Sequence, residues 1–207
     1  MNKILIVGND KIGRRLIHKL EYRKYEGYIY LDKSPKIRRI IKLLIRRRVP
    51  IRHLVNMFLA MFFRQDFVIG YYPAIYSNDD LLQLIKKLSP KTIFFFRAGL
   101  VINKSVIDTG VELINVHCAE LPQYSGLGAI ARAIEDKAYH QCATMHRIIK
   151  KIDAGEILAT MPYMMKKENS YRENEDIAYD AGIRLILIEL GLNVDEWGNI
   201  DDKIKRD

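Results

Sequence analysis

The sequence predicts an α/β fold built on an open, mostly parallel twisted sheet that is flanked by helices. Short apolar runs of strand length alternate with amphipathic helical stretches, which is typical of βαβ units. The 207 residues are 49% hydrophobic and 29% charged, enough to bury a core. No apolar run is long enough to span a bilayer. We expect one domain over residues 1–190 and a polar tail over 191–207.

The chain opens with a strand, a turn, a helix and a second strand. The run KILIVG (residues 3–8) is a buried strand that ends in glycine. Residues 9–20 then have apolar side chains at helical spacing, and GYIYLD (27–32) is the second strand. The intervening GNDKIG is neither a G-x-G-x-x-G nor a P-loop sequence, so we interpret it as a turn.

Helices and strands continue to alternate through the middle of the chain. Residues 36–63 are helical, first basic and then apolar, with a break at Pro50. DFVIGYY (66–72) is the third predicted strand. The helix over 77–88 has a serine or asparagine cap, acids in its first turn and lysines in its last. KTIFFFRA (91–98) is the fourth strand.

The second half supplies the remaining elements. A short helix over 103–110 stops at Gly110, and VELINVH (111–117) is the fifth strand. The expected later elements are a helix over 128–137, strands over 143–149 and 156–164, and a long closing helix over 174–192.

The net charge of +9 lies in one stretch of the chain. Between Lys33 and Arg52 there are nine bases and no acid, and the rest of the chain has equal numbers of both. A solvated helix face, a phosphate-binding role toward a charged substrate, and contact with an anionic membrane surface through residues 33–63 are the three interpretations. No nucleic-acid-binding module surrounds the stretch, so we expect no nucleic acid partner.

Cysteine usage and the N-terminus indicate the compartment. Cys118 and Cys142 are too few for a disulfide framework, and the N-terminal residues do not form a secretory signal. We therefore expect a cytoplasmic protein. C-x-x-C and H-E-x-x-H spacings are missing from the sequence, so we expect no metal.

Three polar residues lie where open α/β sheets bind their ligands. Asn115 and His117 are two apart at the end of an apolar strand, so their side chains share a face. Asp153 follows in a turn between two apolar strands, with Gly155 after it. Taken alone, the three are also compatible with a hydrogen-bonded core histidine and a turn aspartate.

The pattern around these residues is more specific than the residues themselves. It resembles the N10-formyltetrahydrofolate-dependent formyltransferase family, which has a Rossmann-like core. The matching motifs are Asn115–Val116–His117, Leu121–Pro122, Gly126, Thr144–Met145–His146 and Asp153–Ala154–Gly155. Their spacing matches without gaps from about Phe96 to Leu158, and the order of elements fits more loosely across most of the chain.

The resemblance implies an enzyme that moves a formyl group from N10-formyltetrahydrofolate to a primary amine, with Asn115, His117 and Asp153 catalytic. An amide donor such as Asn115 can stabilise the oxyanion of acyl transfer, an effect worth ~10²–10³ in rate. His117 would act either as a charged donor or as a base, and the residues leave both roles open. Asp153 would favour the charged form of His117.

The resemblance also implies a folate slot made of backbone groups in two loops. The matching positions are Ala98, Gly99, Leu100 and Val101 after the fourth strand, and Ile149, Lys150, Lys151 and Ile152 before Asp153. The chain departs from the family pattern where Cys118, Ala119, Ser125 and Cys142 stand. None of these departures touches the three polar residues.

The acceptor is a matter of choosing among the branches of the family. The methionyl-tRNA branch carries a further C-terminal domain, so we expect another acceptor. The glycinamide ribonucleotide branch has a Gly-Ser-Asn loop where this chain has GNDKIG. We expect a nucleotide-linked amino sugar, for example a dTDP-linked sugar of a surface glycan, and a homodimer. The alternatives are glycinamide ribonucleotide transformylase and a catalytically degenerate peripheral membrane or interaction module.

Overall fold

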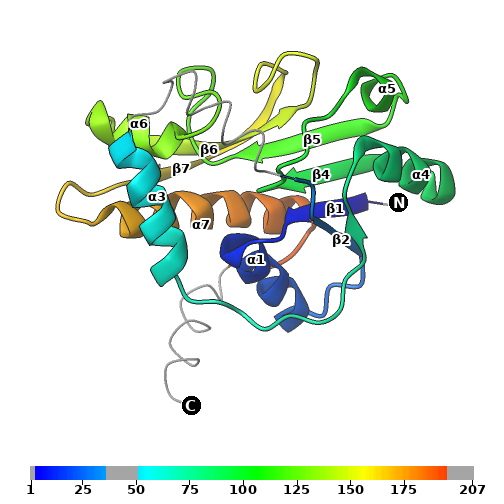
Figure 1. Ribbon diagram of the computed structural model, residues 1–207, viewed down its shortest axis with the longest axis horizontal. Coiled ribbons are helices and arrows are strands. Elements are labelled where there is room, and N and C mark those ends of the chain that lie inside the picture. The colour runs from blue at the N-terminus through cyan, green and yellow to red at the C-terminus, as the bar shows by residue number, and fades with distance from the viewer. Residues whose placement is uncertain (1–2, 36–50, 195–207) are drawn as a thin grey trace.

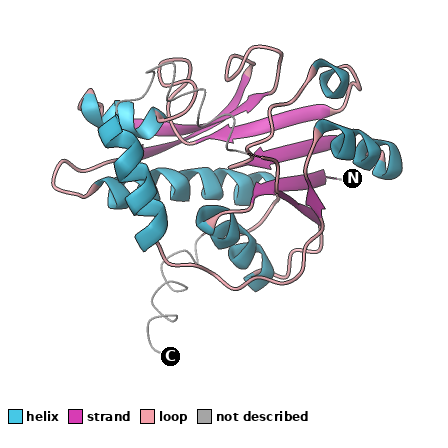
Figure 2. Cartoon of the chain, viewed as in Figure 1, coloured by secondary structure: helices cyan, strands magenta, loops and turns pink. Residues whose placement is uncertain are grey.

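The computed structural model describes residues 3–35 and 51–194 as an open sheet with helices on both faces (Figures 1 and 2). The strands are β1 (Lys3–Gly8), β2 (Tyr28–Asp32), β3 (Ala74–Ile75), β4 (Thr92–Phe96), β5 (Glu112–His117), β6 (His140–Arg147) and β7 (Ile157–Met164). The helices are α1 (Lys11–Tyr22), α3 (Ile51–Phe63), α4 (Asn78–Leu88), α5 (Lys104–Ile107), α6 (Ala129–Glu135) and α7 (Tyr171–Glu189).

The sheet has the order β3-β2-β1-β4-β5-β6-β7. Its first five strands are parallel, and β6 and β7 are antiparallel additions at one edge. The predicted α/β class is confirmed. Because the five parallel strands run the same way, their carboxyl ends and the loops that follow them lie along one edge of the sheet.

The core lies in two layers, one on each face of the sheet. Leu5 and Val7 pack on the face covered by α1 and α7, whereas Ile4 and Ile6 pack on the face covered by α4 and α5. All four side chains are fully buried. A strand buried on both faces has no polar alternation, which is why KILIVG is a continuous apolar run.

Side-chain caps mark where the long helices begin. Ser77 caps α4 and Ser170 caps α7, each as part of a capping box. The first cap agrees with the predicted helix, and the second starts α7 earlier than predicted. The Asp10 carboxylate accepts a hydrogen bond from the Gly13 amide at the start of α1, which makes GNDKIG a capped turn.

The prediction of a strand over residues 66–72 is wrong. Residues 66–72 are a loop, and β3 is the two residues that follow Pro73. The Gly70 amide and the Tyr72 hydroxyl both donate to the Glu21 carboxylate, at 2.8 and 2.9 Å. These contacts hold the loop against α1, so its backbone is not available to the sheet.

Several predictions fall on residues 36–50 or 195–207 and lie outside the described residues. They include the break at Pro50, most of the basic stretch and most of the polar tail. Within the described residues, α3 begins at Ile51 and packs against α7. None of the helices found there is both long and apolar enough to cross a membrane.

Candidate active site

Strand β5 places two of the predicted residues at the carboxyl edge of the sheet. Asn115 and His117 are two apart on this strand and therefore point to the same side. The neighbouring strand β6 is antiparallel, and its His146 pairs directly opposite Asn115. Cross-strand partners lie close enough for their side chains to interact, so β6 brings a third polar group to the pair.

His146 fixes the direction of the Asn115 amide. Its Nδ1–H donates to the Arg147 carbonyl at 3.0 Å, which leaves Nε2 to accept from the Asn115 Nδ2 at 3.1 Å. Burial lowers the pKa of His146, more than its hydrogen bond and Asp153 raise it, so the ring stays neutral. The Thr-x-His motif contained His146, but sequence reasoning gave it no role.

His117 is held by the loop that follows β5. Its Nε2–H donates to the carbonyl of Tyr124 at 2.7 Å. Its Nδ1 faces the Asp153 carboxylate, with 3.7 Å to Oδ2, and both side chains are mostly buried. That separation exceeds a direct hydrogen bond and leaves the pair as neighbouring groups of complementary charge when the ring is protonated.

Asp153 is fixed by the tight turn that carries it. Its φ of 51° is left-handed, a conformation that aspartate tolerates better than most residues. Its Oδ2 accepts from the Gly126 amide at 2.7 Å, and its Oδ1 lies 3.6 Å from His146 Nε2.

Gly155 explains the second half of the Asp-x-Gly motif. A Cβ atom at this position would lie 1.9 Å from the carbonyl oxygen of Arg147, the last residue of β6. Only a residue without a side chain therefore lets the turn close onto the end of β6. The close approach at Gly155 thus helps to fix the position of the Asp153 carboxylate relative to His117 and His146.

A cavity of about 110 Å³ opens beside these groups. Its polar lining is Asn115, His146, Lys150 and Asp153, and its other lining residues are apolar. Of the eight predicted folate-slot positions, six line it: Ala98, Leu100, Val101, Ile149, Lys150 and Ile152. Gly99 and Lys151 belong to the same two loops but are not part of its lining.

Asp32, at the end of β2, is a residue that sequence reasoning missed. Its Oδ2 accepts from the backbone amides of Gly99 and Leu100, the second at 2.9 Å, and the residue is fully buried. Its Oδ1 accepts from the Ser34 amide at 2.8 Å. The carboxylate thereby holds the 98–101 loop in place. The sequence signal that could have identified Asp32 is an acidic residue at the end of a buried apolar strand.

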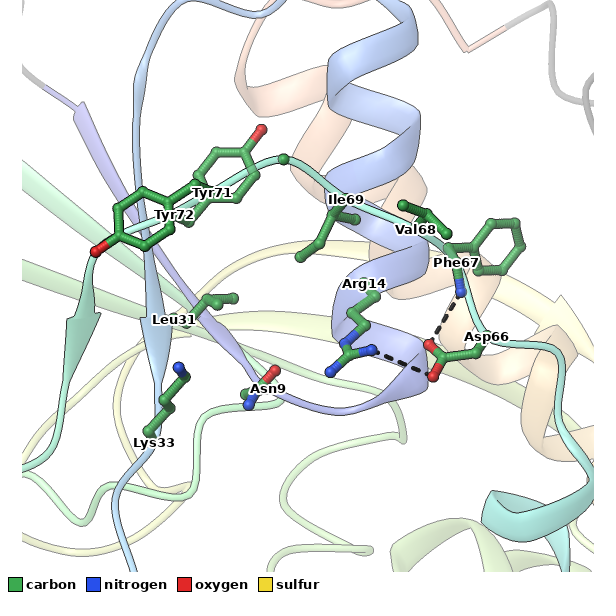
Figure 3. A pocket seen from close by; sticks show the side chains of 11 residues that line it. Asn9, Arg14, Leu31, Lys33, Asp66, Phe67, Val68, Ile69, Tyr71 and Tyr72 are labelled. Carbon is green, nitrogen blue, oxygen red and sulfur yellow. Dashed lines mark hydrogen bonds and ion pairs between the residues drawn. The ribbon is translucent and has the colours of Figure 1, made fainter.

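A second, larger cavity of about 450 Å³ lies on the α1 side of the same sheet edge (Figure 3). Its lining includes Asn9 after β1, Lys33 after β2, and Arg14 on α1. The opposite wall is the 66–72 loop, from which Asp66 pairs with Arg14 at 3.2 Å. Side chains alternate along a strand end, so Leu31 and Lys33 face this cavity while Asp32 faces the 98–101 loop.

A protein-family model described as formyl transferase matches residues 3–186. The chain belongs to this family. The match spans every described strand and the whole of the site, so the family resemblance of the motifs is confirmed.

One curated relative of the chain is named for methionyl-tRNA. A methionyl-tRNA formyltransferase of Sulfurihydrogenibium sp. (strain YO3AOP1) is 30% identical over 130 residues, which cover 62% of this chain and 41% of that protein. The chain thus spans about two fifths of the length of this curated relative.

Solved structures of two kinds share the fold. A phosphoribosylglycinamide formyltransferase from Streptococcus pneumoniae TIGR4 has a TM-score of 0.60 at 15% identity and covers 92% of this chain and 99% of its own. A sugar N-formyltransferase from Shewanella sp. FDAARGOS_354 has a TM-score of 0.59 at 15% identity, covering 92% and 68%. At such identity these structures show the fold alone.

The side chains that meet at the site have the chemical character needed for a reaction at a polarised carbonyl. Among residues 3–35 and 51–194, no cluster of three or more histidine, cysteine or acidic side chains has the arrangement of a metal centre. The groups that do converge are an oriented amide, two imidazoles and a carboxylate. An amide donor and a titratable ring beside an apolar slot suit acyl transfer.

Proposed function

We propose that this protein transfers the formyl group of N10-formyltetrahydrofolate to the primary amine of a nucleotide-linked amino sugar. The observation that carries the formyl-transfer part is that Asn115 and Asp153 line the 110 Å³ cavity. His117 does not line the cavity, but its Nδ1 lies 3.7 Å from the Asp153 carboxylate. The apolar walls and loop backbone of the cavity support the folate as co-substrate, because they suit one face of a flat heteroaromatic ring. The folate would supply the activated formyl carbon.

The residues of the chain have separable roles in this proposal. The Asn115 Nδ2 donates one N–H to His146 and has a second N–H that can donate to an oxygen that gains negative charge. His117 supplies a proton or removes one from the amine, and Asp153 stabilises the charged ring. His146, kept neutral by burial, orients the amide without competing for the proton.

The second cavity favours a nucleotide-linked acceptor. Lys33 and Arg14 outnumber the one acid in its lining, Asp66, which pairs with Arg14, and Asn9 adds an amide donor at the carboxyl end of β1. These are groups that bind the oxygens of a diphosphate. Tyr71 and Tyr72 line its other side and offer aromatic faces for a base. One of the structural neighbours is named as a sugar N-formyltransferase, which agrees with this choice.

Methionyl-tRNA is the second candidate acceptor, because curated relatives that match the chain are named as methionyl-tRNA formyltransferases. Glycinamide ribonucleotide is the third, because a structural neighbour is named for it. All three acceptors present a primary amine beside a phosphorylated group, so the same catalytic residues serve each of them.

Turnover with a panel of acceptors tests the proposal. The panel contains dTDP- and UDP-linked amino sugars, glycinamide ribonucleotide and methionyl-tRNA, each with N10-formyltetrahydrofolate. We expect formylation of a nucleotide-linked sugar. Formylation of methionyl-tRNA or glycinamide ribonucleotide alone would overturn the choice of acceptor. No turnover with any amine would favour the catalytically degenerate module.

A variant at Lys33 tests whether the second cavity holds the acceptor. Lys33→Ala should raise the KM for the acceptor about tenfold and leave the KM for the folate unchanged, because one charge-assisted hydrogen bond is lost. Lys91→Ala is the matched control, since Lys91 is also exposed but precedes β4 at the opposite edge of the sheet. Equal effects of the two variants would remove the cavity from the proposal.

A further inference from the structure

Helix α3 carries an exposed apolar face that the proposed reaction does not use. Val55, Leu59, Phe62 and Phe63 are spaced so that they lie on one side of the helix, and all four are exposed. Phe62 and Phe63, at 66% and 65% exposure, are the most open of them. We call these four residues the α3 apolar face.

Helix α3 also contacts the rest of the fold. Ala60, between the exposed positions, is buried, and the helix packs against α7 (Figure 1). Phe62 and Phe63 contact each other edge to face, with ring centroids 5.1 Å apart. The α3 apolar face is therefore an outward surface and not the exposed rim of a core cluster.

Two cations lie at the C-terminal end of this face. The Lys11 ammonium donates to the Phe62 carbonyl at 3.0 Å and to the Arg64 carbonyl at 2.8 Å. The Arg172 guanidinium donates to the Phe63 carbonyl at 3.2 Å. Both cations therefore lie next to the backbone of the two exposed phenylalanines, Phe62 and Phe63.

The amino-acid sequence adds more charge of the same sign. Nine bases and no acid occur between Lys33 and Arg52, the stretch that leads into α3. Exposed apolar side chains beside a concentration of bases are the combination that binds anionic lipid surfaces. The apolar groups enter the interface and the bases attract the headgroups, at about 1 kcal/mol for each base near the surface.

We propose that the α3 apolar face docks on an anionic membrane surface as a peripheral contact. A second copy of the chain is a less suitable occupant. In a two-fold interface the same patch meets itself, so Lys11 and Arg172 would approach their own copies as like charges. The proposal is independent of the acceptor, and it adds a location to the proposed function.

Vesicle co-sedimentation with the full chain tests the proposal. The vesicles are phosphatidylcholine alone, or phosphatidylcholine mixed with phosphatidylglycerol, at low and high salt. We expect binding to the anionic vesicles to exceed binding to the neutral ones by about tenfold or more, and to weaken as salt rises.

Paired substitutions identify the face. Phe62→Ser with Phe63→Ser should lower the partition constant for anionic vesicles by about tenfold or more, because two exposed rings no longer enter the interface. Met164→Ser with Ile188→Ser is the matched control, since both residues are similarly exposed but lie on β7 and α7. The control should bind as the unchanged protein does.

Three results would overturn the proposal. One is no sedimentation of the unchanged protein with anionic vesicles, and another is equal binding by the two paired variants. The third is a phenylalanine pair that alters self-association in sedimentation velocity runs without vesicles and leaves vesicle binding intact, which would assign the face to a second copy.

A fluorescence measurement covers the case in which the phenylalanine pair fails to fold. Phe62→Trp in a Trp197→Phe background has a single tryptophan on the α3 apolar face. Its emission should shift to shorter wavelength with anionic vesicles. An unchanged emission would overturn the proposal.

Discussion

The two cavities at the carboxyl edge of the sheet differ in how firmly their polar side chains are held. Beside β5, Asn115, His117 and Asp153 each have a defined partner and are largely shielded from solvent. Beside β1 and β2, the Arg14–Asp66 pair has side chains that are 37% and 46% exposed. A chemical step needs groups fixed in advance, whereas the exposed side chains of the second cavity, which we propose for the acceptor, can rearrange around different molecules.

The largest expected effect comes from the oriented amide. Asn115→Ala should lower kcat by ~10²–10³, because the donor for the developing oxyanion is lost. The midpoint of thermal unfolding should change little, since Asn115 lines a cavity and is not fully buried in the core. Steady-state kinetics with the formylated folate measures the first and calorimetry the second. Asn56→Ala, on exposed α3, is the control, and a similar kcat in both variants would contradict the assignment.

Gly155→Ala should have the next largest effect, because it opens the turn that positions Asp153. The added Cβ would meet the Arg147 carbonyl, so the turn must shift. We expect a loss of kcat of tenfold or more and destabilisation by about 2 kcal/mol, as for other overpacked sites. Urea unfolding and kinetics measure both. Ala154→Gly, exposed in the same turn, should be close to neutral, and comparable losses in both would argue against the close approach as the cause.

Asp32→Asn should separate binding of the folate from catalysis. The variant keeps the shape of the side chain but lacks one of the two acceptors for loop and turn amides. A buried amide left without a partner costs about 1–3 kcal/mol. We therefore expect KM for the folate to rise about tenfold while kcat falls less. A fall in kcat at unchanged KM would mean that Asp32 does not act through the 98–101 loop.

Acidification should destabilise the folded chain through His146, which lines the firmly held cavity. Burial lowers the pKa of His146, so the unfolded chain binds more protons there than the folded chain does. The free energy of unfolding should fall as pH drops below the ordinary histidine value of about 6.5 toward the lowered pKa. Denaturant unfolding at about pH 7.5 and about pH 5.5 measures this. His146→Gln should reduce the pH dependence, whereas His140→Gln, at an exposed position, should not.

The smallest effect is expected at the open cavity. Arg14→Ala should change the free energy of unfolding by less than about 1 kcal/mol, because the pair with Asp66 is exposed to solvent. Urea titration measures this, with Asp66→Ala as the matched partner. Should either variant lose several kcal/mol, the pair would be part of the fold and the contrast between the cavities would fail.

Motifs predicted more of the site than residue types alone. The Asn-x-His pair could be placed on one strand face from side-chain alternation, and the structure puts Asp153 beside His117. His146 was inside a quoted motif, but its role depends on antiparallel pairing with β5, which no local pattern reveals. Asp32 depends on a contact between segments 67 residues apart in sequence.

The fold was predictable where burial produced continuous apolar runs, as in β1 and β4. It was not predictable at residues 66–72, whose apolar letters are those of a strand. There Val68 and Tyr71 are almost fully exposed, and Glu21 on α1 provides the partners that a neighbouring strand would have given. Such competition between a sheet edge and one carboxylate is a tertiary effect.

The end of β2 has consequences for how specificity can diverge in this family. One short stretch of backbone serves both cavities. Leu31 and Lys33 line the 450 Å³ cavity, and Asp32 holds the 98–101 loop that lines the 110 Å³ cavity. Mutations that reshape the 450 Å³ cavity by shifting this backbone will also disturb the hydrogen bonds by which Asp32 holds the 98–101 loop. If the two cavities have the proposed roles, new acceptor preferences are more accessible through the 66–72 loop, because that loop lines the acceptor cavity without contacting the carboxylate of Asp32.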